Sequence, residues 1–222
     1  MSFIALIPAR KGSTRLKNKN FKLLKGKPLI YYSIKAAQNC KYISEIHIFS
    51  DSQRINDYAV KLGVINKIER PKKISLSSTT MHETVNYFVD KLSLKKSKLK
   101  YLVLLQPTSP QRTAKDLDKA CEKILKNKKA DALVSSYELK NIFPNQIMFS
   151  DGKYLLLNTN KKWKKNIDCF YRNGPSILIT KIKKISEKNI YEKGKIINFT
   201  MKQKKSVDIN TPDDFRKLIK NF

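Results

Sequence analysis

IALIPARKGSTRLKNKN, residues 4–20, is the stretch from which we predict the fold. An apolar run that is typical of a buried strand ends at Pro8 and gives way to cations, small residues and amides. Arg10 and Lys19 flank the pair Gly12-Ser13. Backbone N–H groups and cations at the end of a strand are typical of a site that binds phosphates. The stretch fits neither the P-loop pattern nor the GxGxxG pattern, and the alternative is a solvated basic turn.

Apolar runs alternate with helical periodicity over the chain that follows. The segments typical of strands are Phe3–Pro8, Glu45–Ser50, Val64–Glu69, Tyr101–Gln106 and Asp131–Tyr137. The amphipathic segments typical of helices are Pro28–Asn39, Arg54–Leu62, Met81–Leu92 and Ala114–Asn127. This βαβα order predicts an α/β fold, a mostly parallel sheet with helices on both faces. Ligands bind such sheets at the carboxyl ends of the strands, where the basic loop of residues 9–20 begins.

The rhythm changes to hairpin-like segments between about Phe143 and Thr180. Ser150-Asp151-Gly152 is typical of a turn, and Ser176–Ile179 is another apolar run. At 222 residues the chain is long enough for one sizeable α/β domain. We therefore predict a single domain over residues 1–222, with an inserted β region at about 140–180.

The cysteines and the hydropathy pattern limit the class of protein. Cys40, Cys121 and Cys169 are odd in number and widely spaced, which argues against a disulfide framework or a zinc site and favours neutral thiols in a reducing compartment. The sequence shows no secretory leader pattern, and no apolar run approaches the roughly 20 residues that span a bilayer. We expect a cytoplasmic protein.

The formal net charge of +29 by itself favours a nucleic acid or another polyanion as partner. Most of the 47 cations are lysines, however, which occur in pairs such as Lys95-Lys96 throughout the chain and are typical of solvated faces. No aromatic residues are interleaved with the lysines in a stacking motif, and no signature of a nucleic-acid-binding module is present. A polyanion-binding protein stays an alternative, and we expect no specific nucleic-acid partner.

A second polar loop follows the predicted strand that ends near Gln106. In LLQPTSP, residues 104–110, two prolines restrict the loop, and the Gln106 amide and the hydroxyls of Thr108 and Ser109 are held at the same sheet edge as the basic loop. Rigid donors and acceptors of this kind suit a base or a sugar. The alternative is a helix N-terminal turn, since Ser109 or Thr113 could cap the helix beginning near Ala114.

A third polar stretch, VDINTPDDF, lies at residues 207–215. Thr211 as N-cap, Pro212 at the first helical position and Asp214 three residues after the cap predict a capping box. Asp208 and Asn210 lie outside that box, two apart on an extended segment, and so point to one side. A carboxylate beside a second oxygen ligand suits Mg²⁺ that bridges phosphates.

Six stretches, in this order, resemble the acylneuraminate (sialic acid type) cytidylyltransferases, which make CMP-activated nonulosonic acids. They are IPARKGSTRLKNKN (7–20), FSD (49–51), ERP (69–71), LLQPTSPQR (104–112), YRNG (171–174) and VDINTPDDF (207–215). Five of the seven arginines fall inside them, at positions 10, 15, 70, 112 and 172. The resemblance implies a Rossmann-like nucleotidyltransferase fold whose inserted β region serves homodimerisation. It also implies the Mg²⁺-dependent reaction of CTP with a nine-carbon 2-keto sugar acid to give a CMP-sugar and pyrophosphate.

The family's pattern also implies roles for single residues. Arg10 and Lys19 would contact the triphosphate, Gln106 would lie between nucleotide and sugar, and Asp208 would bind magnesium. The nucleotide site implied by the loops and the resemblance together is Pro8, Ala9, Arg10, Gly12, Ser13, Asn20, Arg70, Thr80, Gln106, Thr108 and Ser109. Tyr171 and Asn173 would line the sugar site. We predict structural roles for His47 and His82, since neither lies in a recognisable base-and-orienter group.

The chain departs from the family pattern mainly in its sugar-binding half. Asn210 stands where a second aspartate is common, and Phe143-Pro144 stands where a histidine–proline pair is frequent. The sugar is left open among sialic, legionaminic, pseudaminic and other nonulosonic acids. An eight-carbon ulosonic acid cytidylyltransferase is a second alternative. All these roles require that the basic loop and Asp208 converge on one pocket.

Overall fold

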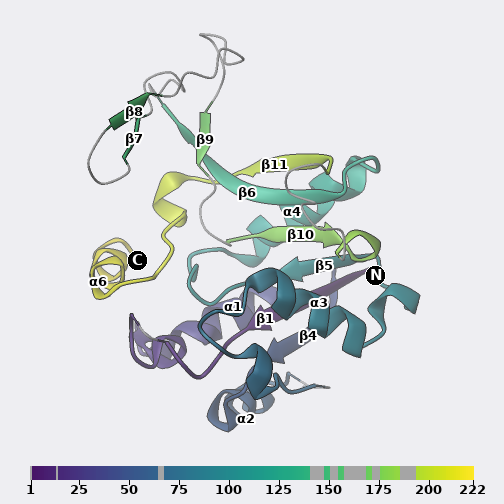
Figure 1. The fold of residues 1–222 in the computed structure, drawn as a ribbon, viewed down its shortest axis with the longest axis horizontal. Helices are drawn as coiled ribbons and strands as arrows, with labels where there is room; N and C mark the ends of the chain where they lie inside the picture. Colours follow the sequence, from purple (N-terminus) through teal and green to yellow (C-terminus); the bar gives the residue numbers. More distant parts are fainter. Residues whose placement is uncertain are drawn as a thin grey trace.

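The structure is a computed structural model that describes residues 2–13, 15–64, 68–140, 148–150, 155–157, 169–171, 176–185 and 194–222. A seven-stranded sheet lies at its centre (Figure 1). Its strands are β1 (Phe3–Pro8), β4 (Ile43–Phe49), β5 (Tyr101–Leu104), β6 (Ala132–Leu139), β9 (Cys169–Tyr171), β10 (Leu178–Lys181) and β11 (Ile196–Thr200). The order across the sheet is β11-β6-β10-β5-β1-β4, and β9 pairs with the end of β6.

The sheet is mostly parallel, as the alternation of apolar runs and helical segments predicts. β1 pairs in parallel with both β4 and β5, and β11 pairs in parallel with β6. β10 is antiparallel to both of its neighbours, with Ile179 opposite Val103 on β5 and Leu133 on β6. The apolar run at 176–179 therefore belongs to the central sheet, and our prediction that it is part of the inserted β region is wrong. β10 is hydrogen-bonded on both sides and Ile179 is fully buried, but the sequence pattern alone does not distinguish such a strand from a hairpin strand.

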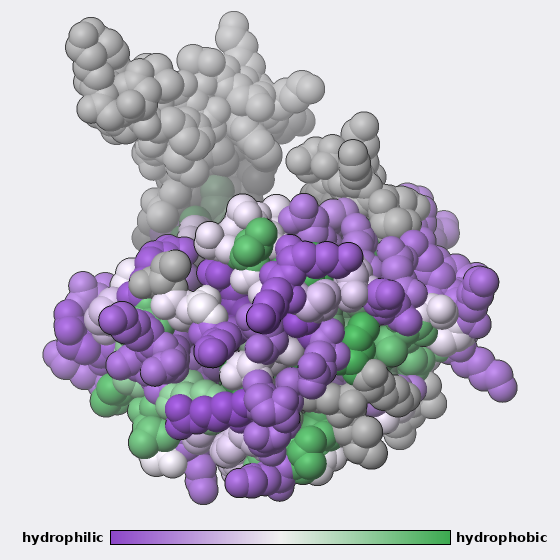
Figure 2. Space-filling model, turned by 60° about the horizontal axis from the view of Figure 1, so that its bottom comes forward, coloured by the Kyte–Doolittle hydropathy of each residue, from purple (hydrophilic) through white to green (hydrophobic). Residues whose placement is uncertain are grey.

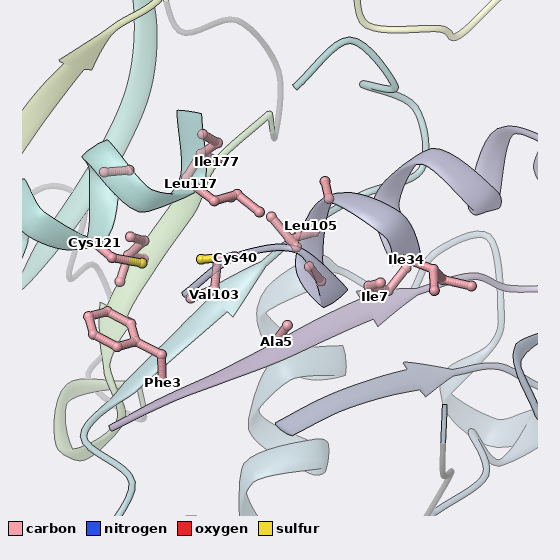
Figure 3. Close-up of a cluster of buried hydrophobic side chains, with 14 of the residues drawn as sticks. Phe3, Ala5, Ile7, Ile34, Cys40, Val103, Leu105, Leu117, Cys121 and Ile177 are labelled. Carbon is pink, nitrogen blue, oxygen red and sulfur yellow. The ribbon is translucent and has the colours of Figure 1, made fainter. Parts of the chain in front are cut away.

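Helices cover both faces of the sheet because alternate residues of the central strands are buried on opposite sides. The helices are α1 (Leu29–Gln38), α2 (Gln53–Lys61), α3 (Met81–Lys91), α4 (Ala114–Lys126) and α6 (Pro212–Asn221). Phe3, Ala5 and Ile7 of β1 are buried in one cluster with side chains of α1, α2 and α4 (Figure 3). Ile4 and Leu6 are buried on the opposite face with side chains of α3. Successive side chains of β1 thus point to opposite faces of the sheet, and both faces are covered by helices.

Short elements complete the described chain. They are the strands β2 (Leu23–Leu24), β3 (Lys27–Pro28), β7 (Met148–Ser150) and β8 (Leu155–Leu157), and the 3-10 turns at Lys19–Phe21, Lys72–Ile74, Leu94–Lys96, Ile182–Lys184 and Gln203–Lys205. β7 and β8 form an antiparallel pair around the predicted turn at 150–152, of which residues 151 and 152 lie outside the described residues.

Most predicted elements are present with small shifts of their ends, and two differ. The predicted strand Val64–Glu69 does not form at Val64, Ile68 or Glu69, which have no regular structure, and residues 65–67 lie outside the described residues. Conversely, β11 was not predicted. It is an edge strand with only half-buried side chains, so its apolar pattern is short and weak.

The three cysteines are free thiols, as predicted. Cys40 and Cys121 are buried, and Figure 3 shows their sulfur atoms facing one another within the core. Hydrophilic side chains cover most of the face of the molecule that Figure 2 displays, which agrees with lysines on solvated faces. In the described part of the chain, no helix combines the length and the apolar character needed to cross a membrane.

Candidate active site

A cavity of about 180 Å³ lies at the carboxyl ends of β1 and β5. The strand order reverses at this point: from β1 the chain continues to β4 on one side, and later returns to β5 on the other side of β1. A ligand site is expected at such a point. The residues that line the cavity are Pro8, Ala9, Arg10, Ser13, Arg15, Leu16, Lys19, Asn20, Arg70, Ser77, Thr79, Met81, Thr84, Gln106, Pro107 and Thr108.

The basic loop is held in place by contacts at both of its ends. The backbone N–H of Lys11 donates to a carboxylate oxygen of Asp51 at 2.7 Å, which ties the start of the loop to the end of β4. The Asn20 side chain, itself buried, donates to the Arg10 carbonyl at 3.2 Å. The Arg10 guanidinium makes no hydrogen bond or ion pair with any residue that the structure describes. The loop is thus fixed while this charge is left available to a ligand.

Lys19 connects the basic loop to the segment ahead of α6. Its ammonium group donates to the Ile209 carbonyl at 3.0 Å, across 190 positions of the sequence. Burial lowers the pKa of Lys19, the Asp208 carboxylate opposes that shift, and repulsion from Arg15 and Arg10 adds to it. Asp208 thus lies close enough to Lys19 of the cavity wall to interact with its charge, but Asp208 and Asn210 are not among the residues that line the cavity, and their place in one pocket with the basic loop stays a prediction.

The loop after β5 reaches the same point. The Thr108 carbonyl accepts a hydrogen bond from the Ile209 N–H at 2.9 Å, so the backbone of Ile209 lies between Thr108 and Lys19. The Thr108 hydroxyl is buried without a hydrogen-bond partner among the described residues and belongs to the cavity wall. Thr113 caps α4 in a capping box with Asp116, so Ser109 is not needed as the cap.

Asp208 has one oxygen fixed and one free. Its Oδ2 accepts a hydrogen bond from the Asn210 amide at 2.8 Å, and its buried Oδ1 has no partner among the described residues. The predicted capping box of α6 is present, and Asp214 also accepts from the Asn210 N–H at 3.0 Å. In this arrangement Asn210 orients the Asp208 carboxylate, and its role as a direct metal ligand stays a prediction.

Arg70 also lines the cavity and is held by hydrogen bonds of its own. Its guanidinium donates to the Ile74 carbonyl, at 2.9 Å from Nε and 2.5 Å from Nη2, and to the Thr84 hydroxyl at 3.0 Å. Burial lowers the pKa of Arg70, the Asp51 carboxylate opposes that shift, and Arg10 adds to it. These hydrogen bonds hold the segment between Arg70 and α3 against the cavity.

The structure brings together most of the residues predicted for the nucleotide. Pro8, Ala9, Arg10, Ser13, Lys19, Asn20, Arg70, Gln106 and Thr108 all line the cavity. Thr80 does not line it and instead caps α3 in a box with Glu83, because its hydroxyl accepts from the Glu83 N–H. Gly12 and Ser109 are also absent from the cavity wall, and Ser109 is 1% exposed.

Of the residues predicted for the sugar, Gln106 lines the cavity and Tyr171 does not. Tyr171 is on β9, 56% exposed, with its ring 5.4 Å from that of Tyr137. Asn173, and also Phe143-Pro144, lie outside the described residues. Neither histidine lines the cavity, and His47 is buried with its ring 5.4 Å from that of Phe88.

Several residues of the cavity wall had no predicted role. They are Arg15, Leu16, Ser77, Thr79, Met81, Thr84 and Pro107. The run of hydroxyl residues at 77–80, just ahead of a capped helix, is a signal that could have indicated Ser77 and Thr79. Thr84 is fully buried although polar, but that burial is visible only in the folded chain.

The oxygen atoms around Asp208 could hold Mg²⁺ only if a bound substrate supplied further oxygen ligands. In the described ranges no group of three or more His, Cys, Asp or Glu side chains could hold a metal ion. Mg²⁺ is commonly held by one or two carboxylates together with substrate phosphates and water. Asp208 does not line the cavity, but its charge interacts with Lys19 of the cavity wall, and its buried Oδ1 has no partner among the described residues, which fits that mode of binding.

Comparisons with known proteins agree on a family. The model of a family described as "Cytidylyltransferase" matches residues 4–161. The CMP-N,N'-diacetyllegionaminic acid synthase of Legionella pneumophila is 32% identical over 220 residues, which cover 97% of this chain and 94% of that protein. An N-acylneuraminate cytidylyltransferase of Streptococcus agalactiae is 27% identical over 97% of this chain, and the match spans about half, 52%, of that protein.

The fold is also found among solved structures. The structure of CMP:2-keto-3-deoxy-manno-octonic acid synthetase complexed with CTP superposes with a TM-score of 0.71, over 99% of this chain and 98% of that one. Its sequence identity is 13%, so this similarity concerns the fold alone.

Proposed function

Because this chain belongs to the cytidylyltransferase family, we propose that it transfers CMP from CTP to the anomeric hydroxyl of a nonulosonic acid and releases pyrophosphate. The relatives described above that carry this activity in their names support the proposal. The site geometry supports it independently of those names.

The observation that carries the proposal is the excess of positive charge around the cavity. Arg10, Arg15, Lys19 and Arg70 all line it, and two of these cations lower the pKa of Lys19 by repulsion. A cluster of cations that repel one another costs free energy in the empty protein and suits a polyanion. A nucleoside triphosphate supplies negative charge on several neighbouring phosphates, which matches this cluster.

The reaction is an in-line attack of the sugar hydroxyl on the α-phosphorus, for which the protein mainly positions the partners and offsets charge. Arg10 and Lys19 stabilise the charge that develops on the phosphates and on the departing pyrophosphate. Gln106 lies between the nucleotide and the sugar, and Tyr171 and Asn173 contact the sugar. The remaining nucleotide-binding residues are Pro8, Ala9, Ser13, Asn20, Arg70 and Thr108, with weaker support for Gly12, Thr80 and Ser109.

Mg²⁺ is the proposed cofactor, held by Asp208 and by phosphate oxygens of CTP. Bound there, it supplies charge neutralisation to the phosphates. Asn210 contributes by fixing the other oxygen of Asp208, since its amide donates to Oδ2. The protein's own part is to present one buried carboxylate oxygen toward the triphosphate.

We also propose that the chain acts as a homodimer. Phe170 and Tyr171 on β9 are 45% and 56% exposed, and β9 pairs with the end of β6 that projects away from the rest of the sheet (Figure 1). Exposed aromatic side chains on such an extension suit burial against a second copy. Equilibrium sedimentation of the wild-type protein measures this association directly.

The experiment that tests the function is pyrophosphate release from CTP and Mg²⁺ with a panel of acceptors. The panel contains N-acetylneuraminic acid, N,N'-diacetyllegionaminic acid, pseudaminic acid and 3-deoxy-manno-octulosonic acid. We expect turnover with a nine-carbon acid and formation of its CMP ester. Turnover with the eight-carbon acid alone supports the related ulosonic acid transferase instead. Absence of CTP-dependent product with every acceptor overturns the proposal.

A further inference from the structure

Arg112 is a buried cation that none of the roles above uses. The residue is 3% exposed, and its guanidinium makes no ion pair with any described carboxylate. Burial lowers its pKa to about 9, so it still carries its charge at neutral pH. A buried charge without an opposite charge is costly unless hydrogen bonds satisfy it. The hydrogen bonds that the Arg112 guanidinium makes therefore indicate its role.

Three oxygen atoms accept hydrogen bonds from the two terminal nitrogens of Arg112. Nη1 donates to the Ser176 carbonyl at 2.7 Å. Nη2 donates to the Gln106 carbonyl at 2.6 Å and to the Ser33 hydroxyl at 2.5 Å. The acceptors belong to three different segments: the loop after β5, helix α1 and the segment that enters β10.

These contacts join parts of the molecule that have different tasks at the site. Gln106 lines the cavity, and fixing its carbonyl fixes the backbone from which its side chain extends. Ser176 follows the YRNG stretch, which is assigned to the sugar under the proposed function. Both carbonyls are bound by one planar guanidinium, so the distance between the two segments is set by the size of that group.

The nucleotide-binding side has its own supports. Lys11 is tied to Asp51, Lys19 to Ile209, and Arg70 to Thr84, and none of these hydrogen bonds involves Arg112. Loss of the Arg112 contacts therefore leaves the basic loop attached while it releases the loop after β5 and the entry to β10.

We propose that Arg112 is a positioning residue that fixes Gln106 relative to the segment entering β10 and thereby affects the affinity for the sugar acid more than the affinity for CTP. This inference rests on the proposed function, because that function assigns the sugar to these segments. Lysine cannot reproduce the role, since a single ammonium group on a flexible stem does not span three fixed acceptors.

The test compares Arg112→Lys and Ser33→Ala with the wild-type protein. Ser33→Ala keeps the guanidinium and removes only its anchor on α1, and alanine is well tolerated in a helix. For the most active acid of the panel, we expect KM to rise by about tenfold or more in Arg112→Lys and less in Ser33→Ala, since small misplacements at a reacting site cost up to about 100-fold. The dissociation constant of CTP, measured by calorimetry without the acid, should rise by a clearly smaller factor than KM, because Gln106 and Thr108 supply only part of the nucleotide site.

Leu117→Ala is the matched control for a purely structural effect. Leu117 is fully buried on α4, five residues after Arg112, and makes none of these hydrogen bonds. We expect Leu117→Ala to lower thermal stability while KM for the acid is unchanged. The proposal is overturned if Leu117→Ala raises this KM as much as Arg112→Lys does, or if CTP affinity falls in parallel.

Hydrogen–deuterium exchange separates a failure of this inference from a failure of the proposed function. In the ligand-free protein, Arg112→Lys and Ser33→Ala should speed exchange in residues 104–111 and 177–181 and leave residues 5–11 unchanged. If the wild-type protein uses no acid of the panel, the proposed function fails, and the exchange pattern still decides whether Arg112 holds the two segments. Unchanged exchange in both variants overturns the inference.

Discussion

Arg10 and Asp208 both have polar atoms that are available to bind a ligand. The Arg10 guanidinium has no partner among the described residues, and Asp208 keeps a buried Oδ1 without one. Neither the Arg10 guanidinium nor the Asp208 Oδ1 makes a hydrogen bond on which the fold of the described residues depends. Substitutions of these two residues therefore report on chemistry more than on stability.

Replacing Arg10 with Ala should lower kcat by about 100- to 1,000-fold, the usual cost of removing one group that stabilises developing charge. The reason is the loss of a fixed cation beside the reacting phosphates. Steady-state pyrophosphate release measures the effect, and the melting temperature serves as the control for folding. Arg10→Lys should recover only part of the rate, because an ammonium group does not replace the bidentate fork. Near-normal kcat/KM in Arg10→Ala contradicts the assigned role.

Replacing Asp208 with Asn should raise the Mg²⁺ concentration needed for half-maximal activity, because a neutral amide is a poorer ligand for this cation than a carboxylate. The matched variant is Asn210→Asp, which places a second carboxylate beside the first. We expect it to shift the requirement in the opposite direction. A magnesium titration at fixed CTP measures both, and an unchanged midpoint in Asp208→Asn removes this residue from the metal site.

At the scale of elements, capped helix ends hold the segments that carry the site. The capping box of α6 begins at Thr211, directly after Asn210, and the cap of α3 at Thr80 directly follows Thr79 of the cavity wall. Each cap fixes the direction in which the chain enters its helix. The cap thus helps to position the residue that lies just ahead of it.

Replacing Asp214 with Ala should lower the free energy of unfolding by about 0.5–2 kcal/mol at pH 7. Burial by itself would raise the pKa of Asp214, but hydrogen bonds from Asn210 and Thr211 outweigh it and lower the pKa below 3.8. A carboxyl whose pKa is lowered on folding stabilises the native state above its unfolded pKa, and this contribution is lost as the pH falls below about 4.

Urea unfolding at pH 7, 5 and 3.5 tests this pH dependence. The difference between wild type and Asp214→Ala should be constant from pH 7 to 5 and shrink at pH 3.5. Asp213→Ala is the control, because Asp213 is 67% exposed and pairs only with Arg216 in the described part of the chain. An equal loss of stability in the two variants contradicts the role of the cap.

Sequence patterns predicted those elements whose signal is local. α3 and α4 carry capping boxes and strong periodicity, and the strands β1 and β5 are short apolar runs that end in polar loops, so their positions could be predicted. The place of β10 between β5 and β6 could not, because it depends on pairing with residues about 45 and 75 positions away, such as Leu133 and Val103. β11 was not predicted because the side chains of this edge strand are only partly buried, so its apolar pattern is weak.

For the site, too, the residues with a local sequence signal could be predicted, whereas roles that depend on the folded chain could not. Arg10, Lys19 and Gln106 follow strands at the binding edge of the sheet, so chain order alone placed them. Thr80 was assigned to the nucleotide, whereas its hydroxyl is used by the cap of α3, a competition that the sequence permits but does not resolve. The importance of Arg112 is visible only from its three acceptors.

At the scale of the whole molecule, the chain carries a formal net charge of +29, and four of its cations line the cavity. The face that Figure 2 displays is mostly hydrophilic. The field of these charges raises the rate at which an anion arrives. Salt screens it, since the Debye length is about 10 Å at 0.1 M ionic strength.

The association rate of CTP should therefore fall as NaCl rises from about 0.02 to 0.5 M, by about tenfold or more. Stopped-flow mixing with a fluorescent CTP analogue measures it. Cytidine carries no phosphate and is the control, for which we expect no salt dependence. If both ligands respond equally, the surface charge does not guide the nucleotide.

Ile209 donates a hydrogen bond to Thr108 and accepts one from Lys19, in two loops that are synthesised much earlier, and 190 positions separate it from Lys19. Ribosomes add about 5–20 residues per second, so about 10 to 40 s pass between synthesis of these two residues. A nascent chain can thus complete the pairing of β1, β4 and β5 well before its nucleotide pocket is closed. The ability to bind the nucleotide is thus acquired at the last stage of translation. A chain that ended before Asp208 would keep much of the core, but it would lack the Asp208 carboxylate and the hydrogen bonds of Ile209 to Thr108 and Lys19.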